Sequence, residues 1–230
     1  MEQNEELPYI EIRCKGEEDW LSNRGLGGSS ASIVLDLNPY RNKRDLYDEL
    51  TNPSTNKGFS NERTIYGHNA ESPIRMLFRL HHPELEVIDP YDEEPVILKS
   101  KEHPFMTATL DGKLIDKESG RKGFYEGKTC HIMNYAQLLE WKDKIPQTYY
   151  CQVLHYFAVT KCDFCYLKAE LIWERVENGV KKVKSEIREY YFTYEGCKED
   201  IDILVSAEVD FMENYVNKGI RPRDSKSYFL

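Results

Sequence analysis

The sequence lacks the long apolar segments of a membrane protein. No run in its 230 residues approaches the roughly 20 apolar residues that span a bilayer. The first residues, MEQNEELPYIEIRC, are acidic and do not have the basic and then apolar layout of a signal peptide. We therefore expect a cytoplasmic protein with no membrane partner, whose six cysteines are reduced.

Motifs of several common enzyme classes are also missing. No Gly-x-Gly-x-x-Gly follows an expected strand, and no Walker loop is present. No serine or cysteine lies in a known nucleophile motif. Cys162 and Cys165 have the spacing of half a metal site, but the other cysteines do not complete a known ligand spacing. These absences argue against nucleotide-binding, zinc and redox sites of the usual kinds.

Positive charge is in deficit. The chain has 31 Lys and Arg against 40 Asp and Glu, a net charge of −9. A protein that coats nucleic acid along its whole surface needs Lys and Arg to neutralise phosphates, so the composition argues against that class. It leaves room for a nuclease with a locally basic groove, in which the basic residues must be concentrated.

The chain has the length and composition of one large α/β domain. Hydrophobic residues make up 40% of it, and no repeat or linker divides it. We expect a single domain over residues 1–230 with short, loose termini. The expected helices are one begun by Ser29 or Ser30 and stopped by Pro39, a basic polar one from residue 40 that leads into a loop over 52–60, one over 64–82, a short one closed by Pro146, one over 147–162, and one over 196–217. The expected strands are two within 85–98 around an acidic turn, a hairpin over 105–129, and two around an Asn178-Gly179 turn.

The stretch FMTATLDGKLIDKESGRKGFYEGKT, residues 105–129, predicts a β-hairpin with a glycine-rich, charged link. Side chains at i and i+2 of a strand point the same way, so Glu126 and Lys128 share a face. Asp111 on the other arm can share it. Two carboxylates and an ammonium are costly in a core unless the carboxylates hold a divalent cation and the lysine faces a water or phosphate. The alternative is an ordinary solvated hairpin face.

A second stretch, NRGLGGSSASIVLDLNPY, predicts a helix after a glycine-rich turn. A helix N-terminus with free amides, two serine hydroxyls and the nearby Arg24 is suited to hold a phosphate. The alternative is an ordinary capped helix.

Two isolated polar residues have competing interpretations. Glu71, which we place near the start of the helix over 64–82, is either a partner of the helix dipole or an outer ligand of a metal or water. Gln152 lies beside the apolar face of the helix over 147–162. Its surroundings alone favour a partly buried amide bonded to backbone.

These pieces occur in an order that resembles the YqaJ-type viral recombinase family. The family includes lambda-type phage exonucleases of the PD-(D/E)xK nuclease superfamily. The resemblance spans roughly residues 20–170 and rests on Arg24 with GLGGSSASIVLDLNPY, GHNAE ending in Glu71, HPFMTATLDG with Asp111, YEGK with Glu126 and Lys128, and PQTYYCQVLHYFAVT with Gln152. It implies a restriction-endonuclease-like α/β fold, a mixed β-sheet flanked by α-helices.

The resemblance also implies an activity. It is Mg²⁺-dependent digestion of one strand of linear double-stranded DNA, 5′ to 3′, leaving 3′ single-stranded tails for recombination by strand annealing, with Mn²⁺ as a substitute metal. The implied partners are DNA ends, a single-strand annealing protein and further copies of the chain in a trimeric ring. The alternatives are a structure- or site-specific endonuclease of the same superfamily and a DNA-end-binding module with a silent site.

The resemblance assigns the metal chemistry to the hairpin. Asp111 and Glu126 would hold Mg²⁺ together with the carbonyl of Gly127. Lys128 would orient the attacking water and help to deprotonate it. Gly127 stands where the family usually has Leu, Ile or Val, so the strand would lose a packing side chain.

The remaining assignments surround that centre. Glu71 would support the metal or water shell, and Gln152 would position the lysine or the water, with Tyr149 close by. Arg24 and a serine would receive the 5′-phosphate, and the sequence leaves open which serine it is. The candidates for this phosphate and DNA contact are Arg24, Ser29, Ser30, Ser32 and Thr109.

Overall fold

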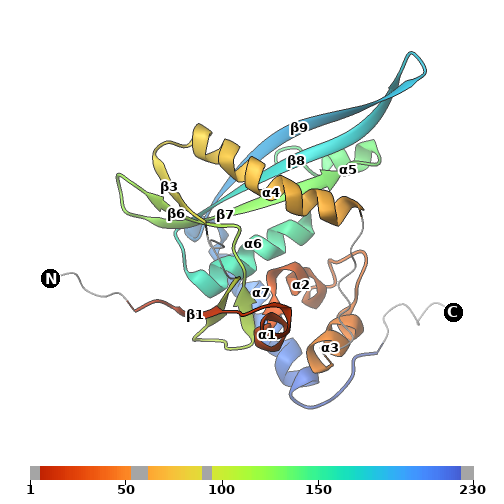
Figure 1. Ribbon diagram of the computed structural model, residues 1–230. Coiled ribbons are helices and arrows are strands. Elements are labelled where there is room, and N and C mark those ends of the chain that lie inside the picture. Colours follow the sequence, from red (N-terminus) through yellow and green to blue (C-terminus); the bar gives the residue numbers. More distant parts are fainter. Residues whose placement is uncertain (1–5, 53–61, 90–94, 224–230) are drawn as a thin grey trace.

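The structure is a computed structural model that describes residues 6–52, 62–89 and 95–223. It contains two mixed β-sheets with helices against them (Figure 1). Most of the loop expected over 52–60 and of the acidic turn within 85–98 lies outside the described residues. Within the described ranges, no helix combines the length and apolar character that a transmembrane segment needs.

The smaller sheet is built from β1 (Tyr9–Arg13), β2 (Leu26–Gly27), β4 (Val96–Ser100) and β5 (Met106–Ala108). Its strand order is β1-β4-β5-β2. β4 pairs antiparallel with both β1 and β5, whereas β2 runs parallel to β5.

The larger sheet is built from β3 (Leu85–Ile88), β6 (Gly112–Asp116), β7 (Lys122–His131), β8 (Phe164–Glu177) and β9 (Val180–Thr193). These strands are neighbours in that same order. β7 and β8 run parallel, and the other pairs are antiparallel.

The described α-helices are α1 (Glu17–Asn23), α2 (Gly28–Val34), α3 (Lys43–Thr51), α4 (Glu62–His81), α5 (Tyr135–Leu139), α6 (Gln147–Thr160) and α7 (Lys198–Phe211). The larger core joins α2, α6 and α7 to one face of β8, where Leu167, Ala169 and Leu171 are fully buried. A smaller core joins Phe78 of α4 to Tyr125 of β7. Helices therefore cover both faces of the larger sheet.

The expected hairpin over 105–129 is partly wrong. Its second half is the antiparallel pair β6 and β7, but its first arm is divided between the two sheets. β5 ends at Ala108 in the smaller sheet, and β6 begins at Gly112 in the larger one. The alternation of apolar and polar residues continues through this crossing, so the pattern carries no signal for the change of sheet.

Two helix boundaries also differ from expectation. α2 begins at Gly28 with Gly27 as its N-cap and no side-chain capping bond, so neither Ser29 nor Ser30 is the cap. The short helix α5 ends at Leu139, and Pro146 is instead the N-cap of α6. Proline tolerates this place because the first amides of a helix have no partner within the helix.

Helix α4 spans Glu62–His81, close to the expected 64–82, so Glu71 lies near its middle and not in its first turn. The interpretation of Glu71 as a partner of the helix dipole is therefore wrong. Pro73 is inside the helix and has no amide hydrogen to donate to the preceding turn.

The two hairpin strands around Asn178-Gly179 are confirmed as β8 and β9. Asn178 and Gly179 both have positive φ, 53° and 77°, as the short turn between twisted strands requires.

Candidate active site

Asp111 and Glu126 meet where the chain crosses from the smaller to the larger sheet. Gly112, the first residue of β6, pairs with Tyr125 of β7, so the residues next to this pair, Asp111 and Glu126, come together at the crossing. The Gly127 amide donates to Asp111 Oδ2 at 2.9 Å. Arg75 of α4 donates to the Asp111 carbonyl at 2.8 Å and so fixes the backbone at the crossing.

The carboxylate of Glu126 is buried, with 1% of the residue exposed. Its Oε1 accepts from Lys128 Nζ at 2.5 Å and from Gln152 Nε2 at 2.8 Å. Its Oε2 is also buried, yet it has no hydrogen-bond partner among the described residues. A buried carboxylate oxygen without a partner is costly, and such an oxygen is a ready ligand for a cation.

Negative charge exceeds positive charge at this point. Burial, with added repulsion from Asp111 and Glu71, raises the pKa of Glu126 to about 8. Burial also raises the pKa of Asp111, although Lys128 opposes it. Burial by itself would lower the pKa of Lys128, but the charges of Glu126 and Asp111 outweigh it and raise that pKa. The site thus keeps a charged lysine beside carboxylates that ionise only with difficulty unless a further cation is bound.

A hydrated divalent cation fits these donors. No three His, Cys, Asp or Glu side chains within residues 6–52, 62–89 and 95–223 could hold a metal ion among themselves. The protein groups that could hold one are instead the carboxylates of Asp111 and Glu126, with the Gly127 carbonyl as the third ligand expected from the sequence. Mg²⁺ usually keeps several waters and uses one or two carboxylates, so this small set suits it.

The glycine between Glu126 and Lys128 is explained by a neighbouring ring. A Cβ added at Gly127 would lie 3.3 Å from the Tyr125 hydroxyl oxygen and 3.7 Å from Asp111 Oδ2. Tyr125 therefore occupies the space of the missing side chain. Its hydroxyl is buried without a hydrogen-bond partner in the described part of the chain.

Gln152 reaches the site from α6. Its Nε2 donates to Glu126 and also to the Tyr156 hydroxyl at 3.0 Å, so the amide bonds to side chains and not to backbone. A Cβ at Gly28 of α2 would lie 2.6 Å from the Tyr156 ring and 2.9 Å from Gln152. Only glycine allows α2 to approach these two side chains so closely.

The other two residues expected at the centre are near it. The Tyr149 ring is 5.4 Å from Lys128 Nζ, and its hydroxyl is hydrogen-bonded to Cys130 Sγ at 3.2 Å. Glu71 of α4 is partly exposed and contributes to the raised pKa of Glu126.

A pocket of about 180 Å³ beside this centre holds three of the five residues expected to contact DNA, namely Arg24, Ser29 and Thr109. Arg24 Nη2 donates to Ser29 Oγ at 3.4 Å, and the guanidinium lies 4.8 Å from the centre of the Trp20 ring. Tyr156 lines the same pocket. A cation and a hydroxyl that converge on a small cavity are suited to bind a phosphate.

Ser30 and Ser32 are not brought to this pocket. They are 2% and 0% exposed, and the Ser32 hydroxyl accepts from Asn38 at 3.1 Å. The structure therefore does not bring their hydroxyls to the small pocket, because α2 is buried at residues 30–34.

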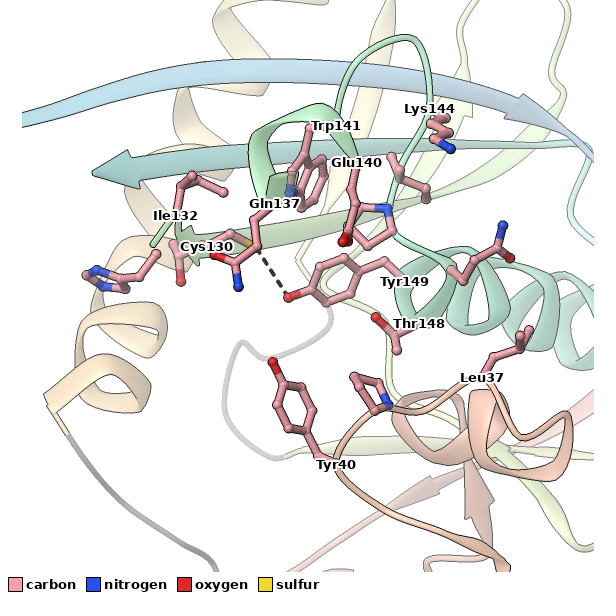
Figure 2. Close-up of a pocket in the computed structure, with 16 residues that line it drawn as sticks. Leu37, Tyr40, Cys130, Ile132, Gln137, Glu140, Trp141, Lys144, Thr148 and Tyr149 are labelled. Atoms are coloured by element: carbon pink, nitrogen blue, oxygen red, sulfur yellow. Dashed lines mark hydrogen bonds between the residues drawn. The ribbon is translucent and has the colours of Figure 1, made fainter. Parts of the chain in front are cut away.

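A wider cleft of about 620 Å³ begins at Thr129, the residue after Lys128, and is also lined by Tyr149. Figure 2 shows Tyr149 and Tyr40 on its walls, with Lys144 at its margin. Tyr40 is 81% exposed, and its hydroxyl contributes to a raised pKa of Tyr149 whose largest cause is burial. The cleft follows the end of β7 from Thr129 to Ile132.

Sequence reasoning missed two residues of this arrangement. Arg75 holds the Asp111 carbonyl, and no local pattern marks it. Tyr156 is a different case, because its spacing of four residues from Gln152 on one helix predicts contact between the two side chains.

Comparisons with known proteins place these features in a family. Residues 9–163 match the YqaJ-like viral recombinase domain. The chain is 29% identical over 219 residues to the uncharacterized protein YqaJ of Bacillus subtilis (strain 168), a match that covers 92% of this chain and 61% of that protein. The chain thus spans about three fifths of the length of this curated relative.

Solved structures share the fold. The alkaline exonuclease LHK-Exo of Laribacter hongkongensis aligns with a TM-score of 0.58 at 17% identity, over 89% of this chain and 97% of that one. The same enzyme in complex with dAMP aligns with a TM-score of 0.56 at 16% identity, with the same coverage. A phage-related exonuclease of Haemophilus somnus 129PT aligns with a TM-score of 0.51 at 14% identity, over 87% and 99%.

The expected fold class is confirmed as a restriction-endonuclease-like α/β fold, with the strands divided between two mixed sheets. The family match covers more than half of the sequence and includes Asp111, Glu126, Lys128 and Gln152. The chain belongs to the YqaJ-like viral recombinase domain family.

Proposed function

We propose that this protein is a Mg²⁺-dependent exonuclease that removes nucleotides from the 5′ end of one strand of linear duplex DNA. The observation that carries the proposal is the buried, unpartnered Oε2 of Glu126 beside Asp111 and Lys128. The fold shared with alkaline exonucleases supports it.

Asp111, Glu126 and the Gly127 carbonyl would hold the metal. A bound divalent ion polarises the scissile phosphate and lowers the pKa of a bound water. Manganese, which also accepts carboxylate and carbonyl ligands, would substitute for magnesium.

The protein side chains position the reacting groups. Lys128 stays charged and supplies a cation where negative charge develops on the phosphate. Gln152 fixes the Glu126 carboxylate through Oε1, so Oε2 would be left to hold the metal. Glu71 adds negative charge from α4 and would bond to the outer waters of the ion.

End recognition would come from the smaller pocket. Arg24 and Ser29 converge on it, and Thr109, two residues before Asp111, lines the same wall. A terminal phosphate bound there would place the first phosphodiester bond next to the metal ligands, because Tyr156 lines this pocket and also bonds to Gln152.

Digestion of matched DNA substrates tests this function. We expect release of nucleotides from linear 5′-phosphorylated duplex in Mg²⁺, slower release without the 5′-phosphate, and none in chelator. Asp111→Asn and Lys128→Ala should abolish release while the circular dichroism spectrum stays that of the wild type. Nicking of closed circular DNA would instead favour an endonuclease, and DNA binding without metal-dependent release would favour a silent end-binding module.

Ser29 and Ser32 provide a matched pair for the pocket. Ser29→Ala should reduce the preference for a 5′-phosphate several-fold, because one direct hydrogen bond is lost. Ser32→Ala should leave the preference unchanged, since Ser32 is buried against Asn38. An effect of Ser32→Ala as large as that of Ser29→Ala would contradict this pocket assignment.

The partners we propose beyond DNA ends rest on the family alone. They are a single-strand annealing protein, which would bind the 3′ single strand that digestion leaves, and two further copies of the chain in a ring. The mass of the protein in solution, with and without DNA, tests the ring, and a monomer under both conditions would contradict it.

A further inference from the structure

The hairpin of β8 and β9 reaches beyond the rest of the molecule (Figure 1). β7 ends at His131, opposite Ile172, and past this point β8 and β9 pair only with each other among the described strands. The side chains from residue 174 to 176 and from 180 to 187 are exposed. We call residues 174–187 the arm.

One face of the arm continues the face that carries the candidate active site. Lys128 lies opposite Ala169 in the parallel ladder of β7 and β8. Side chains alternate along a strand, so Arg175, six residues beyond Ala169, is on the same face as Lys128. Lys182 pairs with Arg175 and is on that face too, as is Lys184 two residues further on.

Three cations surround a single carboxylate on this face. Glu177 forms ion pairs with Lys182 at 3.1 Å and with Lys184 at 3.3 Å, and Arg175 Nε is 3.9 Å from its carboxylate. The three basic side chains are 55%, 45% and 70% exposed, in that order. Glu186, the other carboxylate of the arm on this face, is bonded to Arg188 just beyond the arm. Glu177 alone therefore faces three cations, which leaves a surplus of two positive charges.

The opposite face of the arm has no such surplus. There Lys181 pairs with Glu174 at 3.0 Å, one charge against one. In a chain with a net charge of −9, the excess positive charge of the arm is thus on the face shared with the active site.

Successive residues of α6 connect the small pocket, the candidate metal ligands and the wider cleft. Tyr156 of α6 lines the small pocket, Gln152 contacts the metal ligand Glu126, and Tyr149 lines the wider cleft. The cleft continues along the last residues of β7, to His131. The arm extends past that end of the sheet.

We propose that the basic face of the arm binds the sugar-phosphate backbone of the DNA duplex ahead of the active site. This inference rests on the proposed nuclease function. Phosphates are recognised by Lys and Arg that are otherwise incompletely neutralised. Duplex DNA is a polyanion, and it is long enough to extend from the small pocket, past the metal ligands and the cleft, to the arm.

The distance from the active site to the arm sets a minimum length of duplex for this contact. Six residues of strand separate Ala169 from Arg175, which corresponds to about 20 Å at about 3.3 Å per residue. Duplex DNA rises about 3.4 Å per base pair, so the arm meets the backbone about 6 base pairs from the cleaved bond. A shorter duplex cannot reach it.

Two hairpin DNAs with 5′-phosphates test this requirement, one with a stem of about 40 base pairs and one with about 5. The variant Lys182→Glu/Lys184→Glu should bind the long stem about 10-fold more weakly than wild type in chelator, with a less steep dependence on salt. It should bind the short stem as wild type does. In Mg²⁺, the KM for the long stem should rise with little change in kcat.

Lys181→Glu is the matched control for the single variant Lys182→Glu, because the two make the same charge change on adjacent residues of opposite faces. It should change binding of either DNA by less than about 2-fold, since its face carries a balanced pair. Equal losses of DNA affinity for Lys181→Glu and Lys182→Glu would overturn the proposal. An equal loss of affinity for the long and the short stem would overturn it too.

Different results would refute the arm contact and the proposed nuclease function. Weaker binding of the long stem by the arm variant, with no cleavage by any protein, would leave the arm contact standing and refute the nuclease. Normal cleavage and binding by the arm variant would refute the arm contact alone. A changed mass in solution with unchanged DNA affinity would show that the arm joins copies of the chain, and would also overturn the proposal.

Discussion

Gln152 Nε2 donates to Glu126 Oε1 at 2.8 Å, and the same nitrogen donates to the Tyr156 hydroxyl at 3.0 Å. The helix α6 thus fixes one oxygen of a buried carboxylate on β7 and leaves the other one without a partner. A carboxylate held in this way has its rotation set before any cation arrives, which lowers the cost of binding one.

Removal of this contact should reduce catalysis more than stability. Gln152→Ala leaves Lys128 as the remaining donor to Oε1 and frees the carboxylate to turn, so we expect kcat to fall about 10- to 100-fold. Tyr156→Phe keeps the Gln152–Glu126 bond and should cost only a few-fold. Steady-state kinetics over a range of Mg²⁺ concentrations measures both effects, and a larger loss for Tyr156→Phe would contradict the assigned role of Gln152.

The raised pKa of Glu126 predicts a stability cost in the metal-free protein. The native pKa is about 8 against 4.5 for the free side chain, so the folded state holds the proton more tightly than the unfolded state. Stability linked to this group is full below pH 4.5 and is lost as the pH rises to about 8. Glu126→Gln should therefore abolish cleavage and yet raise the melting temperature in chelator at about pH 8.5.

Magnesium provides the control for that prediction. It should raise the melting temperature of the wild type at the same pH, because it binds only the folded state, and should have little effect on Glu126→Gln. A melting temperature in chelator that is the same for both proteins would contradict a buried, unsatisfied carboxylate at position 126.

Much of the larger sheet could be predicted because its signals are local. The turn at Asn178-Gly179 requires two residues that accept positive φ, and both are present in the sequence. The split of the first hairpin arm could not be predicted, because residues on either side of Asp111 alternate in the same way whichever sheet they join. The change of sheet is set by tertiary contacts such as that of Arg75 with the Asp111 carbonyl.

The candidate site shows the same division. Spacing on one strand predicted that Glu126 and Lys128 share a face, the hairpin pattern added Asp111, and the order of motifs added Gln152. The choice between Ser29 and Ser32 depended on which of the two is buried, and the glycine-rich turn before the helix gives no signal for this. The space at Gly127 likewise depends on the rotamer of Tyr125, which no sequence pattern specifies.

Gly127 and Tyr125 should be energetically coupled. Gly127→Ala puts a methyl 3.3 Å from the Tyr125 hydroxyl oxygen, so it should lower stability by about 1 kcal/mol through overpacking. Tyr125→Phe removes a buried hydroxyl that has no partner among the described residues, and should be neutral or stabilising. In the double variant the alanine should cost less than it does alone, and denaturant unfolding of the four proteins measures the coupling. Strict additivity would contradict the contact.

His155 of α6 and Glu208 of α7 form a second buried polar pair, where these two helices pack together. Both are fully buried, and His155 Nδ1 is 2.8 Å from Glu208 Oε1. His155 Nε2 is 3.0 Å from the carbonyl of Thr107, which can only accept, so Nε2 carries a hydrogen. Burial by itself would lower the pKa of His155, but Glu208 outweighs burial and raises it above the usual 6.5.

The sign of this shift predicts how stability changes with pH. A raised native pKa adds stability that is full below pH 6.5 and is lost as the pH rises through the native pKa. Glu208→Gln replaces the charge with an amide that suits neutral imidazole. The variant should therefore be less stable than wild type by about 1–3 kcal/mol near pH 5.5, and the difference should shrink or reverse near pH 9. Glu102→Gln, an exposed carboxylate beside His103, is the control and should leave this part of the profile unchanged. Urea unfolding across the pH range measures both, and a constant difference between Glu208→Gln and wild type would show that His155 does not change its charge there.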